Sequence, residues 1–514
     1  MSKTIIIIGA GLAGLSAALQ AAENGCNVKL VSSLPSERAQ SVMAEGGINA
    51  ALNTKDENDS PEEHFTDTIK AACGLADPNA VWGMTQAAPE LVHWLLKLGV
   101  KFNMSGYDDV DLRNFGGQKK KRTAFAQSDT GKQIMTAMID AVRRKEASGM
   151  VERFSHHSFL TLRLCGNICC GCVIRDEYSQ ETVELPGDAV IVATGGMHGL
   201  FGNTTGSLSN TGEVTAELFR PGVPLANGEM IQYHPTTVKC GGKRMLISEA
   251  ARGEGGRLFA MKDGKQWYFM EEKYPELGNL MPRDITAREI WKVSHESEVF
   301  LDMTEISEEI ISNKLSGLAD DCMTYLHKDI RKETVSVLPG IHYFMGGILV
   351  DEQHRTPIQN LYAAGECCAQ YHGANRLGGN SLLGALYGGR VAAKSACEQA
   401  DVVDLSCATQ IDFPPASQIS EIKQLNKVMQ ETMGVVRNEN TLLNGIQTVQ
   451  ALTGNLPLLG MAVLKSALAR KESRGAHWRE DYPKSNDNDY LKTTVARFDG
   501  KQIQISFVPV PERR

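Results

Sequence analysis

The sequence is poor in cysteine and has no surplus of basic residues, and each shortage excludes a class of protein. Its 514 residues include 12 cysteines, too few for a disulfide scaffold, and two pairs are adjacent, at 169–170 and 367–368. We therefore expect reduced thiols and a cytoplasmic protein. Lys and Arg number 53 against 61 Asp and Glu, a net charge of −8, which argues against nucleic-acid binding.

Long hydrophobic runs are missing as well. No segment reaches the roughly 18 consecutive apolar residues of a membrane-spanning helix, so we expect any membrane association to be indirect. The apolar residues 5–8 lack a basic flank and a cleavage site, and we interpret them as folded protein rather than a signal peptide. No internal repeat or low-complexity tract is present.

Glycine, by contrast, is abundant, with 49 residues, and the earliest of them form a motif. Residues 5–8 predict a buried strand, alanines at helical spacing follow, and 28–31 predict a second strand, which together make one βαβ unit. Between strand and helix, Gly9, Gly11 and Gly14 satisfy G-x-G-x-x-G. These glycines allow a tight turn, approach of a pyrophosphate and close helix packing, so they predict dinucleotide binding. The alternative is a purely structural glycine turn.

Small and polar residues recur at later strand ends, where they could line a long, extended cofactor. Ser32 ends the second strand, where an acidic ribose-binding residue would be usual. The other candidates are Glu45, Gly46, Gly47, Thr194, Gly195 and Glu366. This spread fits FAD better than NAD. Because no second G-x-G-x-x-G follows a strand, we expect electrons to arrive from outside the chain.

The middle and end of the chain predict further domains. From about residue 221 the sequence becomes mixed loops, and strand-like residues resume only near 346–350, which indicates an inserted domain. A Pro414-Pro415 break precedes a helical region in which Ile422, Leu425, Met429 and Met433 share a face. The last 20 residues predict a hairpin that turns at Asp499-Gly500.

Nine stretches, in order and nearly end to end, resemble the flavoprotein subunit of the succinate dehydrogenase and fumarate reductase family. They are AEGGINAAL (44–52), FGGQKKKRTAFAQSDTG (115–131), QYHPT (232–236), SEAARGEGG (248–256), PRDITAR (282–288), HYFMGG (342–347), AAGE (363–366), HGANRLGGNSLL (372–383) and ESRGAHWREDYP (472–483).

The resemblance implies an α/β fold with a Rossmann-type FAD-binding domain, an inserted α+β capping domain and a C-terminal helical region. We place the FAD-binding domain at 1–225 and 344–413, the capping or substrate domain at 226–343, and the helical domain with its terminal hairpin at 414–514. Ser381 and Leu382 join the residues expected to bind FAD. No metal site is expected.

The resemblance also implies a substrate, a four-carbon dicarboxylate. His234, His342 and Arg376 are donors that can bind carboxylates, and a small dianion is their natural ligand. Thr237 is a further candidate, and Phe115 would form an apolar wall. Fumarate and succinate would then exchange hydride with flavin N5. A histidine taken alone is more often a structural side chain, but the HPT and HYxMGG contexts favour the binding role.

Arg283 is the implied proton donor, with Glu249 and Arg252 relaying protons from solvent. Free arginine does not lose its proton near neutral pH, so transfer must be concerted with resupply. The alternative is that Arg283 pairs with Asp284 on a surface helix.

Gln40 stands where many respiratory members carry the histidine that binds flavin covalently. We therefore predict non-covalent FAD, a bias toward fumarate reduction, and a catalytic subunit that works with an iron-sulfur partner. Contact with the inner face of a membrane would come through partner subunits.

The main rival activity is L-aspartate oxidase, a relative with a similar length and non-covalent FAD. That enzyme resembles Glu-Gly-Gly-His-Ser where this chain has Phe115-Gly116-Gly117-Gln118-Lys119, and the phenylalanine suits an uncharged olefin better. A flavin-binding assembly module without activity is a second alternative.

A cluster of cysteines and a cluster of basic residues each suggest a binding function, but a structural explanation is favoured for both. Cysteines 165, 169, 170 and 172 have no common metal or cluster spacing and fall where a β-hairpin is expected, so we interpret them as structural thiols. Residues 119–122 (KKKR) could attract an acidic partner, but a solvated loop is the commoner explanation.

Overall fold

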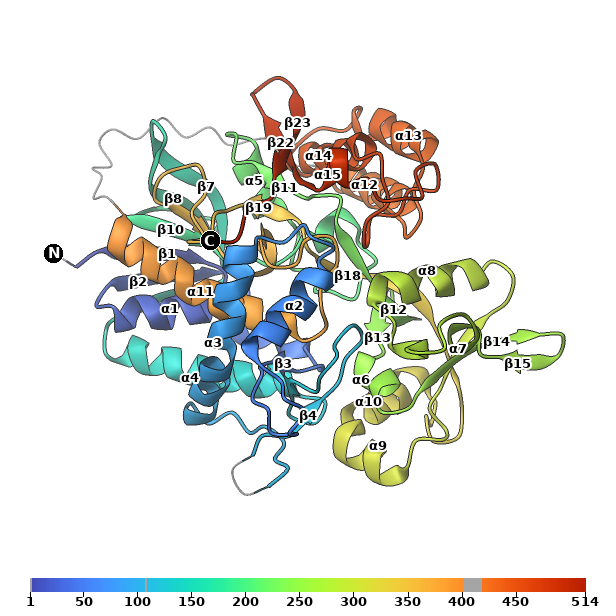
Figure 1. Cartoon of the computed structure of the whole chain (residues 1–514). Helices are drawn as coiled ribbons and strands as arrows, with labels where there is room; N and C mark the ends of the chain where they lie inside the picture. Colours follow the sequence, from blue (N-terminus) through green and yellow to red (C-terminus); the bar gives the residue numbers. More distant parts are fainter. Residues whose placement is uncertain (1, 107–108, 401–417) are drawn as a thin grey trace.

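The structure is a computed structural model that describes residues 2–106, 109–400 and 418–514. Figure 1 shows three regions: a large lobe with a central sheet on the left, a smaller lobe at the lower right, and a group of helices with a hairpin at the top. The large lobe combines segments from both halves of the chain, and the smaller lobe is one continuous insertion.

A parallel sheet of Rossmann type forms the centre of the large lobe. Its order is β20 (Leu361–Ala363), β10 (Ala189–Val192), β1 (Thr4–Ile8), β2 (Asn27–Ser32) and β6 (Val151–Ser155). The predicted βαβ unit is confirmed, with α1 (Leu12–Glu23) between β1 and β2.

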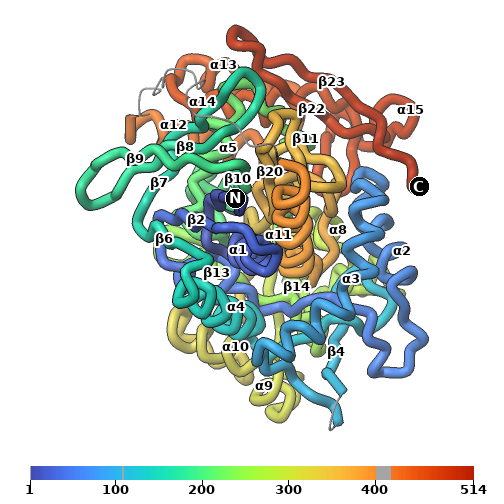
Figure 2. Tube along the Cα trace, turned by 90° about the vertical axis from the view of Figure 1, so that its left-hand side faces the viewer, coloured from blue at the N-terminus to red at the C-terminus, as the bar shows by residue number. Residues whose placement is uncertain are grey.

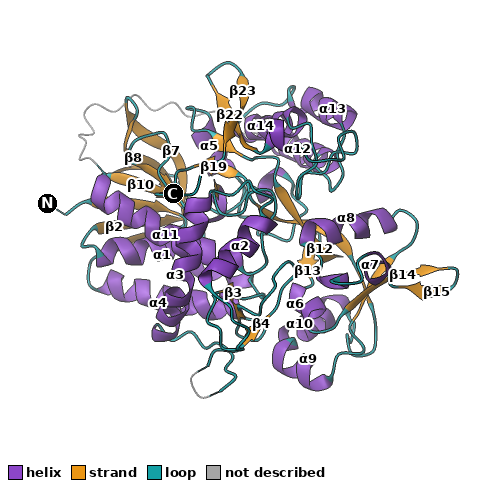
Figure 3. Cartoon of the chain, in the orientation of Figure 1, coloured by secondary structure: helices purple, strands orange, loops and turns teal. Residues whose placement is uncertain are grey.

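The isoleucines of β1 are buried on both faces of this sheet, as the apolar run predicts. Side chains alternate along a strand, so Ile5 and Ile7 face one layer and Ile6 and Ile8 the other. The first layer contains helices α1, α3 (Pro78–Lys97), α4 (Thr130–Ala147) and α11 (Asn380–Gln399), which Figure 3 shows grouped on one side. Helix α2 (Pro61–Ala71) and the short strands β3 (Ile48–Asn49), β4 (Leu112–Arg113) and β5 (Thr123–Ala124) complete this side.

The second layer is a three-stranded antiparallel sheet. It contains β7 (His157–Cys165), β8 (Ile168–Asp176) and β9 (Thr182–Pro186). The hairpin expected around the four clustered cysteines is therefore confirmed. Cys169 and Cys172 are buried in the core beneath the parallel sheet, and burial raises the pKa of the Cys169 thiol to about 12.

A mixed sheet joins the middle of the chain to its C-terminal end. Its order is β21 (Cys368–Ala369), β19 (Gly347–Leu349), β11 (Leu225–Ala226), β22 (Lys492–Phe498) and β23 (Ile503–Pro509). The predicted terminal hairpin is confirmed, and Asp499 accepts backbone hydrogen bonds in its turn. Because β22 pairs with β11, this hairpin extends a sheet of the large lobe rather than belonging to the helical region alone.

The inserted lobe has two small sheets. One contains β12 (Ile231–Cys240), β13 (Lys243–Leu246) and β18 (Leu338–Phe344); the other contains β14 (Arg257–Lys262), β15 (Lys265–Trp267), β16 (Val299–Asp302) and β17 (Val335–Ser336). Around them lie α6 (Glu249–Gly253), α7 (Phe269–Lys273), α8 (Arg283–Val293), α9 (Glu308–Lys314) and α10 (Ser316–Asp321). Since β12 and β18 pair, the insertion leaves and rejoins the large lobe at one place.

The top group in Figure 1 contains α12 (Ile419–Thr432), α13 (Glu439–Val449), α14 (Asn455–Ala469) and α15 (Asp487–Tyr490). The shared face predicted on α12 is confirmed for Leu425, Met429 and Met433, which are fully buried, whereas Ile422, the first residue of that face, is only partly buried. The Pro414-Pro415 break and the boundary at 413/414 lie outside the described residues. Among the residues that are described, no helix combines the length and apolar character needed to span a bilayer.

Candidate active site

The glycine turn after β1 is tightly constrained by the strand beside it. Gly9 has φ +110°, and a Cβ there would lie 2.2 Å from the carbonyl oxygen of Ala193. A Cβ on Gly14 would lie 1.8 Å from the oxygen of Gly9, so only glycine lets α1 approach the turn this closely. At Gly11 the nearest atom is 3.6 Å away, which leaves the backbone at the helix N-terminus open to a phosphate group.

Ser32, the last residue of β2, is buried, and its hydroxyl has no hydrogen-bonding partner within the described part of the chain. A buried hydroxyl without a partner is costly, and a ribose hydroxyl from a dinucleotide would satisfy it. Serine therefore fills the position where an acidic residue is usual, and it fits the same sugar.

Three of the other residues predicted to bind FAD, Thr194, Gly195 and Glu366, follow the carboxyl ends of the neighbouring strands β10 and β20. A Cβ on Gly196, after β10, would lie 2.6 Å from a carboxylate oxygen of Glu366, after β20. Ser381 and Leu382 begin α11, which packs against α1. Glu45 precedes β3, and burial raises the pKa of its carboxyl to about 8. These positions, with Gly46, Gly47, Thr194 and Gly195, stay the residues predicted to bind FAD.

Arg283 is the first residue of α8, and its guanidinium is buried against Glu249. Nε and Nη2 donate to the same oxygen, Oε2 of Glu249, at 2.7 and 2.5 Å, and Nη1 donates to Oε1 of Gln232 at 3.1 Å. Only 6% of Arg283 is exposed. The alternative pairing on a surface helix is therefore wrong, because Asp284 instead accepts a hydrogen bond from Asn375.

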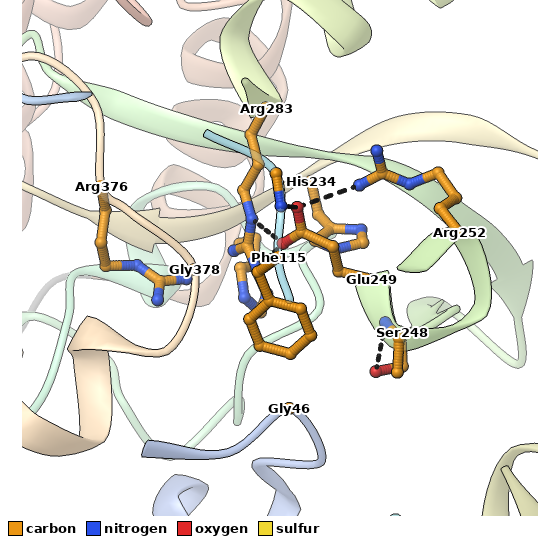
Figure 4. Close-up of polar contacts among 12 residues, drawn as sticks. Gly46, Phe115, His234, Ser248, Glu249, Arg252, Arg283, Arg376 and Gly378 are labelled. Carbon is orange, nitrogen blue, oxygen red and sulfur yellow. Dashed lines mark hydrogen bonds and ion pairs between the residues drawn. The ribbon is translucent and has the colours of Figure 1, made fainter. Parts of the chain in front are cut away.

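Glu249 lies between two guanidinium groups. Its Oε1 accepts from the backbone N–H of Gly116 at 3.0 Å and lies 3.5 Å from Nη2 of Arg252. Burial alone would raise the pKa of Glu249, but the charges of Arg283 and Arg252 outweigh it and hold the pKa below its usual value. Burial, together with the Arg283 charge, lowers the pKa of Arg252 despite the nearby Glu249. Figure 4 shows the carboxylate of Glu249 between Arg283 and Arg252.

His234 and His342 lie together on the paired strands β12 and β18. Their ring centroids are 5.2 Å apart. The backbone N–H of Thr236 donates to Nδ1 of His234 at 3.3 Å, which leaves the hydrogen of the neutral ring on Nε2, and Nε2 is buried without a partner among the described residues. Nδ1 of His342 lies 2.8 Å from the Thr205 hydroxyl. Burial, then the charge of Arg283, holds both pKa values well below the ordinary value, so both rings are neutral at pH 7.

Arg376 provides a further cation. Its guanidinium lies 4.4 Å from the ring centroid of Tyr343, and its buried Nε has no partner within the described residues. Burial and the charge of Arg283 lower the pKa of Arg376 to about 9. The side chain therefore carries an unsatisfied donor in a desolvated position, which is the requirement for strong carboxylate binding.

Phe115 forms an apolar surface beside these cations. It is 1% exposed and lies between two backbone segments, since a Cβ on Gly46 or on Gly378 would approach its ring to 3.1 or 3.0 Å. Figure 4 shows the ring between Gly46 and the Arg283–Glu249 pair. Position 115 therefore carries an apolar ring and not a carboxylate.

Thr237 is the one substrate candidate that the structure does not bring into the cluster. Its hydroxyl donates to the oxygen of Leu338 at 2.7 Å and accepts from Nε of Arg244. Ser248, which directly precedes Glu249, caps α6, because its hydroxyl oxygen accepts a hydrogen bond from the backbone N–H of Ala250.

Sequence reasoning missed the residues that support the site. Gln232 precedes His234 by two positions on β12, and strand alternation could have placed both on one face. Thr205 and His198 come from the loop after β10, and no periodicity marks them.

The interpretation of residues 119–122 (KKKR) as a solvated loop is corrected by the structure. The loop is not fully solvated, because Arg122 is completely buried between Asp59 and Asp67. No group of three or more potential ligands is arranged to hold a metal ion in the part of the chain that the structure describes.

Comparisons with known proteins agree with this geometry. Residues 4–382 match a family model described as an FAD binding domain, and residues 452–513 match one described as fumarate reductase flavoprotein C-term. The fold and the site therefore define an FAD-dependent oxidoreductase.

Similarity to individual proteins shows which family of FAD-dependent oxidoreductases the chain belongs to. The chain is 37% identical to the succinate dehydrogenase flavoprotein subunit of Bacillus subtilis, over 100% of this chain and 98% of that protein. It is 33% identical to L-aspartate oxidase of Pyrococcus furiosus, over 96% and 98%. The solved structure of E. coli quinol fumarate reductase FrdA matches with a TM-score of 0.90 at 27% identity, over 99% of this chain and 97% of that one. The chain belongs to the succinate dehydrogenase and fumarate reductase flavoprotein family, as the sequence motifs predict.

Proposed function

We propose that this protein interconverts fumarate and succinate with FAD as its redox cofactor. The observation that carries the proposal is the charge of the buried cluster. The guanidinium groups of Arg252, Arg283 and Arg376 and the carboxylate of Glu249 leave two positive charges, and the two neighbouring histidines are neutral. A flat dianion beside Phe115 neutralises that excess.

The binding residues also activate the substrate. His234, His342 and Arg376 donate hydrogen bonds to the carboxylates, which withdraws electron density from the double bond and stabilises carbanion-like charge in the transition state. Removing one such donor costs about 2.7–4 kcal/mol in the barrier. Bound FAD supplies the hydride donor and acceptor, at flavin N5.

Arg283 supplies the proton, and Glu249 resupplies it. Oε2 of Glu249 contacts Arg283, and Oε1 faces Arg252, so the carboxylate can accept a proton from the side of Arg252 and pass that same proton to Arg283. This arrangement answers the difficulty that arginine holds its proton strongly. Release from Arg283 is concerted with resupply from Glu249, and the nearby positive charge of Arg252 favours it.

An activity assay tests the proposal. Purified protein with reduced viologen should reduce fumarate, and Arg283→Ala should retain FAD and ligand binding but lose about 10²–10⁴-fold in turnover. Arg288→Ala is the matched control, because Arg288 lies on the same helix over Trp478. Wild-type turnover in the Arg283→Ala variant would remove Arg283 from the mechanism.

Gln40, in the turn Gln40–Met43, supports non-covalent FAD, because an amide cannot take the place of a flavin-bonding histidine. Acid or denaturant should release all flavin from the polypeptide. Fluorescence that stays with the chain in a denaturing gel would contradict this. Since covalent attachment raises flavin potential, we also propose that the enzyme favours fumarate reduction.

We further propose that the protein works as the catalytic subunit of a complex with an iron-sulfur partner. Relatives such as the 8-methylmenaquinol:fumarate reductase flavoprotein of Wolinella succinogenes are named as subunits, and that protein is 32% identical over 100% of this chain and 92% of its own length. We place the protein in the cytoplasm, reaching a membrane only through such partners. Native purification, scored for iron and companion polypeptides, tests this.

We also propose the domain division expected from the sequence: an FAD-binding domain at 1–225 and 344–413, a capping or substrate domain at 226–343, and a helical domain with the terminal hairpin at 414–514.

L-aspartate oxidase remains the second candidate, because a relative of that activity matches the chain nearly end to end. The buried apolar ring of Phe115 disfavours it, since a substrate ammonium needs a carboxylate there. Hydrogen peroxide formed from aspartate, without fumarate reduction, would support this rival.

A further inference from the structure

We propose that Cys26 and Cys397 are a redox pair that forms an intramolecular disulfide. The two Sγ atoms lie 2.8 Å apart although the residues are separated by 371 positions. A covalent S–S bond is about 2.04 Å long, so the sulfur atoms need to approach by only about 0.8 Å. This inference is independent of the proposed function.

The backbone holds the pair in place from both sides. Cys26 follows the turn after α1, and Cys397 is in the last turn of α11. Figures 1 and 2 both show these helices side by side, and Ser16 of α1 donates to the oxygen of Leu386 in α11 at 2.6 Å. Nζ of Lys3 donates to the backbone oxygen of Cys397 at 2.7 Å. The two thiols are therefore preorganised, and little ordering entropy opposes the bond.

The exposure of the two thiols determines the order of the reaction. Cys26 is 5% exposed, whereas Cys397 is partly exposed and can meet an oxidant first. With a small external disulfide as oxidant, the thiolate of Cys397 attacks one external sulfur and releases one thiolate. The thiolate of Cys26 then attacks Sγ of Cys397 and releases the second. The two protein thiols lose two protons and two electrons, and the external disulfide becomes two thiols.

The environment of Cys397 makes this reaction slow at neutral pH. Burial and the hydrogen-bonded Cys26 thiol raise the pKa of Cys397 to about 12. Since the thiolate is the nucleophile, its fraction, and with it the oxidation rate, should rise about tenfold per pH unit between pH 7 and 9.

The bond would join the C-terminal ends of two helices whose N-terminal ends form part of the proposed cofactor site. Because it closes a long loop, it should raise the thermal unfolding midpoint of the holoenzyme by several degrees. Among the described residues, the sulfur atoms of Cys26 and Cys397 make no hydrogen bond to Arg283, Glu249 or Arg252, so turnover should change less than twofold.

Oxidised glutathione added to the purified holoenzyme at pH 8.5 tests the proposal. Peptide mapping without reduction should show one cross-link between residues 26 and 397, removed by dithiothreitol. The cross-link and the midpoint shift should both be absent in Cys397→Ser and in Cys26→Ala. They should remain in Cys240→Ser, which removes a partly exposed thiol at the end of β12.

Two results would overturn the proposal. One is a Cys397 that stays a mixed disulfide with glutathione while Cys26 remains reduced. The other is a protein whose two thiols both resist oxidation at pH 8.5 while Cys240 reacts. If Cys26→Ala does not fold, Cys397→Ser alone decides, because that side chain lies at the partly exposed end of α11.

Discussion

Arg283 and Arg376 share one hydrogen-bonding partner, the carboxamide of Gln232. Nη1 of Arg283 donates to Oε1 at 3.1 Å, and Nε2 of Gln232 donates to the backbone oxygen of Arg376 at 2.8 Å and to Oδ1 of Asn375 at 2.9 Å. The donor and acceptor of an amide have fixed geometry, so this side chain sets the spacing of the two arginines. It thereby positions the proposed proton donor, Arg283, relative to Arg376, which we propose binds a substrate carboxylate.

Gln232→Leu should therefore lower kcat/KM for fumarate reduction about 10–100-fold while FAD content stays unchanged. Its apolar side chain leaves Nη1 of Arg283 and the oxygen of Arg376 buried without partners, and each unsatisfied group costs about 1–3 kcal/mol. Steady-state kinetics and flavin absorbance measure both quantities. Gln86→Leu, on the exposed face of α3, is the control and should leave both unchanged. Equal kcat/KM for the two variants would exclude a positioning role.

Much of the fold could be predicted because its signals are local. The unbroken isoleucine run of β1, the spacing of the glycines in the turn and the 3.6-residue period of the apolar face of α12 are each visible within a short stretch of sequence. The pairing of β22 with β11 joins segments far apart in the chain, and no local pattern specifies it. The same limit applies to the site. The family motifs indicated Arg283, Glu249 and Arg376, but the hydroxyl of Thr237 is taken by Arg244, a contact that no motif records.

Arg122 shows how burial reverses an interpretation made from charge alone. It follows three lysines, yet it is fully buried, and Nη2 and Nη1 lie 2.8 and 3.0 Å from Asp59 and Asp67. Burial raises the pKa of Asp59 even though the charge of Arg122 opposes this shift. The arginine therefore compensates two desolvated carboxylates.

We expect Arg122→Met to lower the free energy of unfolding by about 3–5 kcal/mol, because it leaves buried charge without a partner. Chemical denaturation of the holoenzyme, followed by fluorescence, measures the change. Lys121→Met is the matched control, since that neighbouring side chain is exposed, and it should shift the midpoint little. A shift no larger than that of the control would mean that the carboxylates are compensated elsewhere.

Thr205 orients His342, one of the residues that we propose bind the substrate. Its hydroxyl lies 2.8 Å from Nδ1 of His342 and 3.3 Å from the backbone oxygen of Ile341. We infer that it donates along the shorter contact, which places the imidazole hydrogen on Nε2, where it can bind a carboxylate. Thr205→Val should raise KM for fumarate about tenfold, the equivalent of one lost hydrogen bond. Thr205→Ser keeps the hydroxyl and should restore KM. Failure of the serine variant to restore it would point to the lost methyl group instead.

The buried histidines make stability depend on pH in a direction that can be worked out. Burial lowers the pKa of six of them below the usual value of about 6.5, to about 3 for His64 and about 4 for His354, and also for His234, His342, His372 and His477. Below pH 6.5 the unfolded chain therefore binds protons that the folded chain does not, and stability falls as pH falls. Above pH 7 these groups are neutral in both states and contribute no slope.

Each such histidine should cost about 1 kcal/mol between pH 6.5 and 5.5. Glu45 acts oppositely, because its pKa is raised to about 8 and its stabilising effect is lost as pH rises through that value. Burial also raises the pKa of four other carboxyl groups, which oppose the histidines in the same way: Asp59, Glu213, Asp284 and Asp321. We expect the six imidazoles to outweigh these carboxyl groups, so the free energy of unfolding should drop by several kcal/mol on acidification from pH 7 to 5.5. Calorimetry in buffers of different ionisation enthalpy should then detect proton uptake on unfolding at pH 5.5. His354→Asn removes a buried imidazole outside the proposed substrate site and should reduce that uptake by about one proton. Proton release at pH 5.5, or an uptake identical in the variant, would show that these side chains are not held neutral in the folded protein.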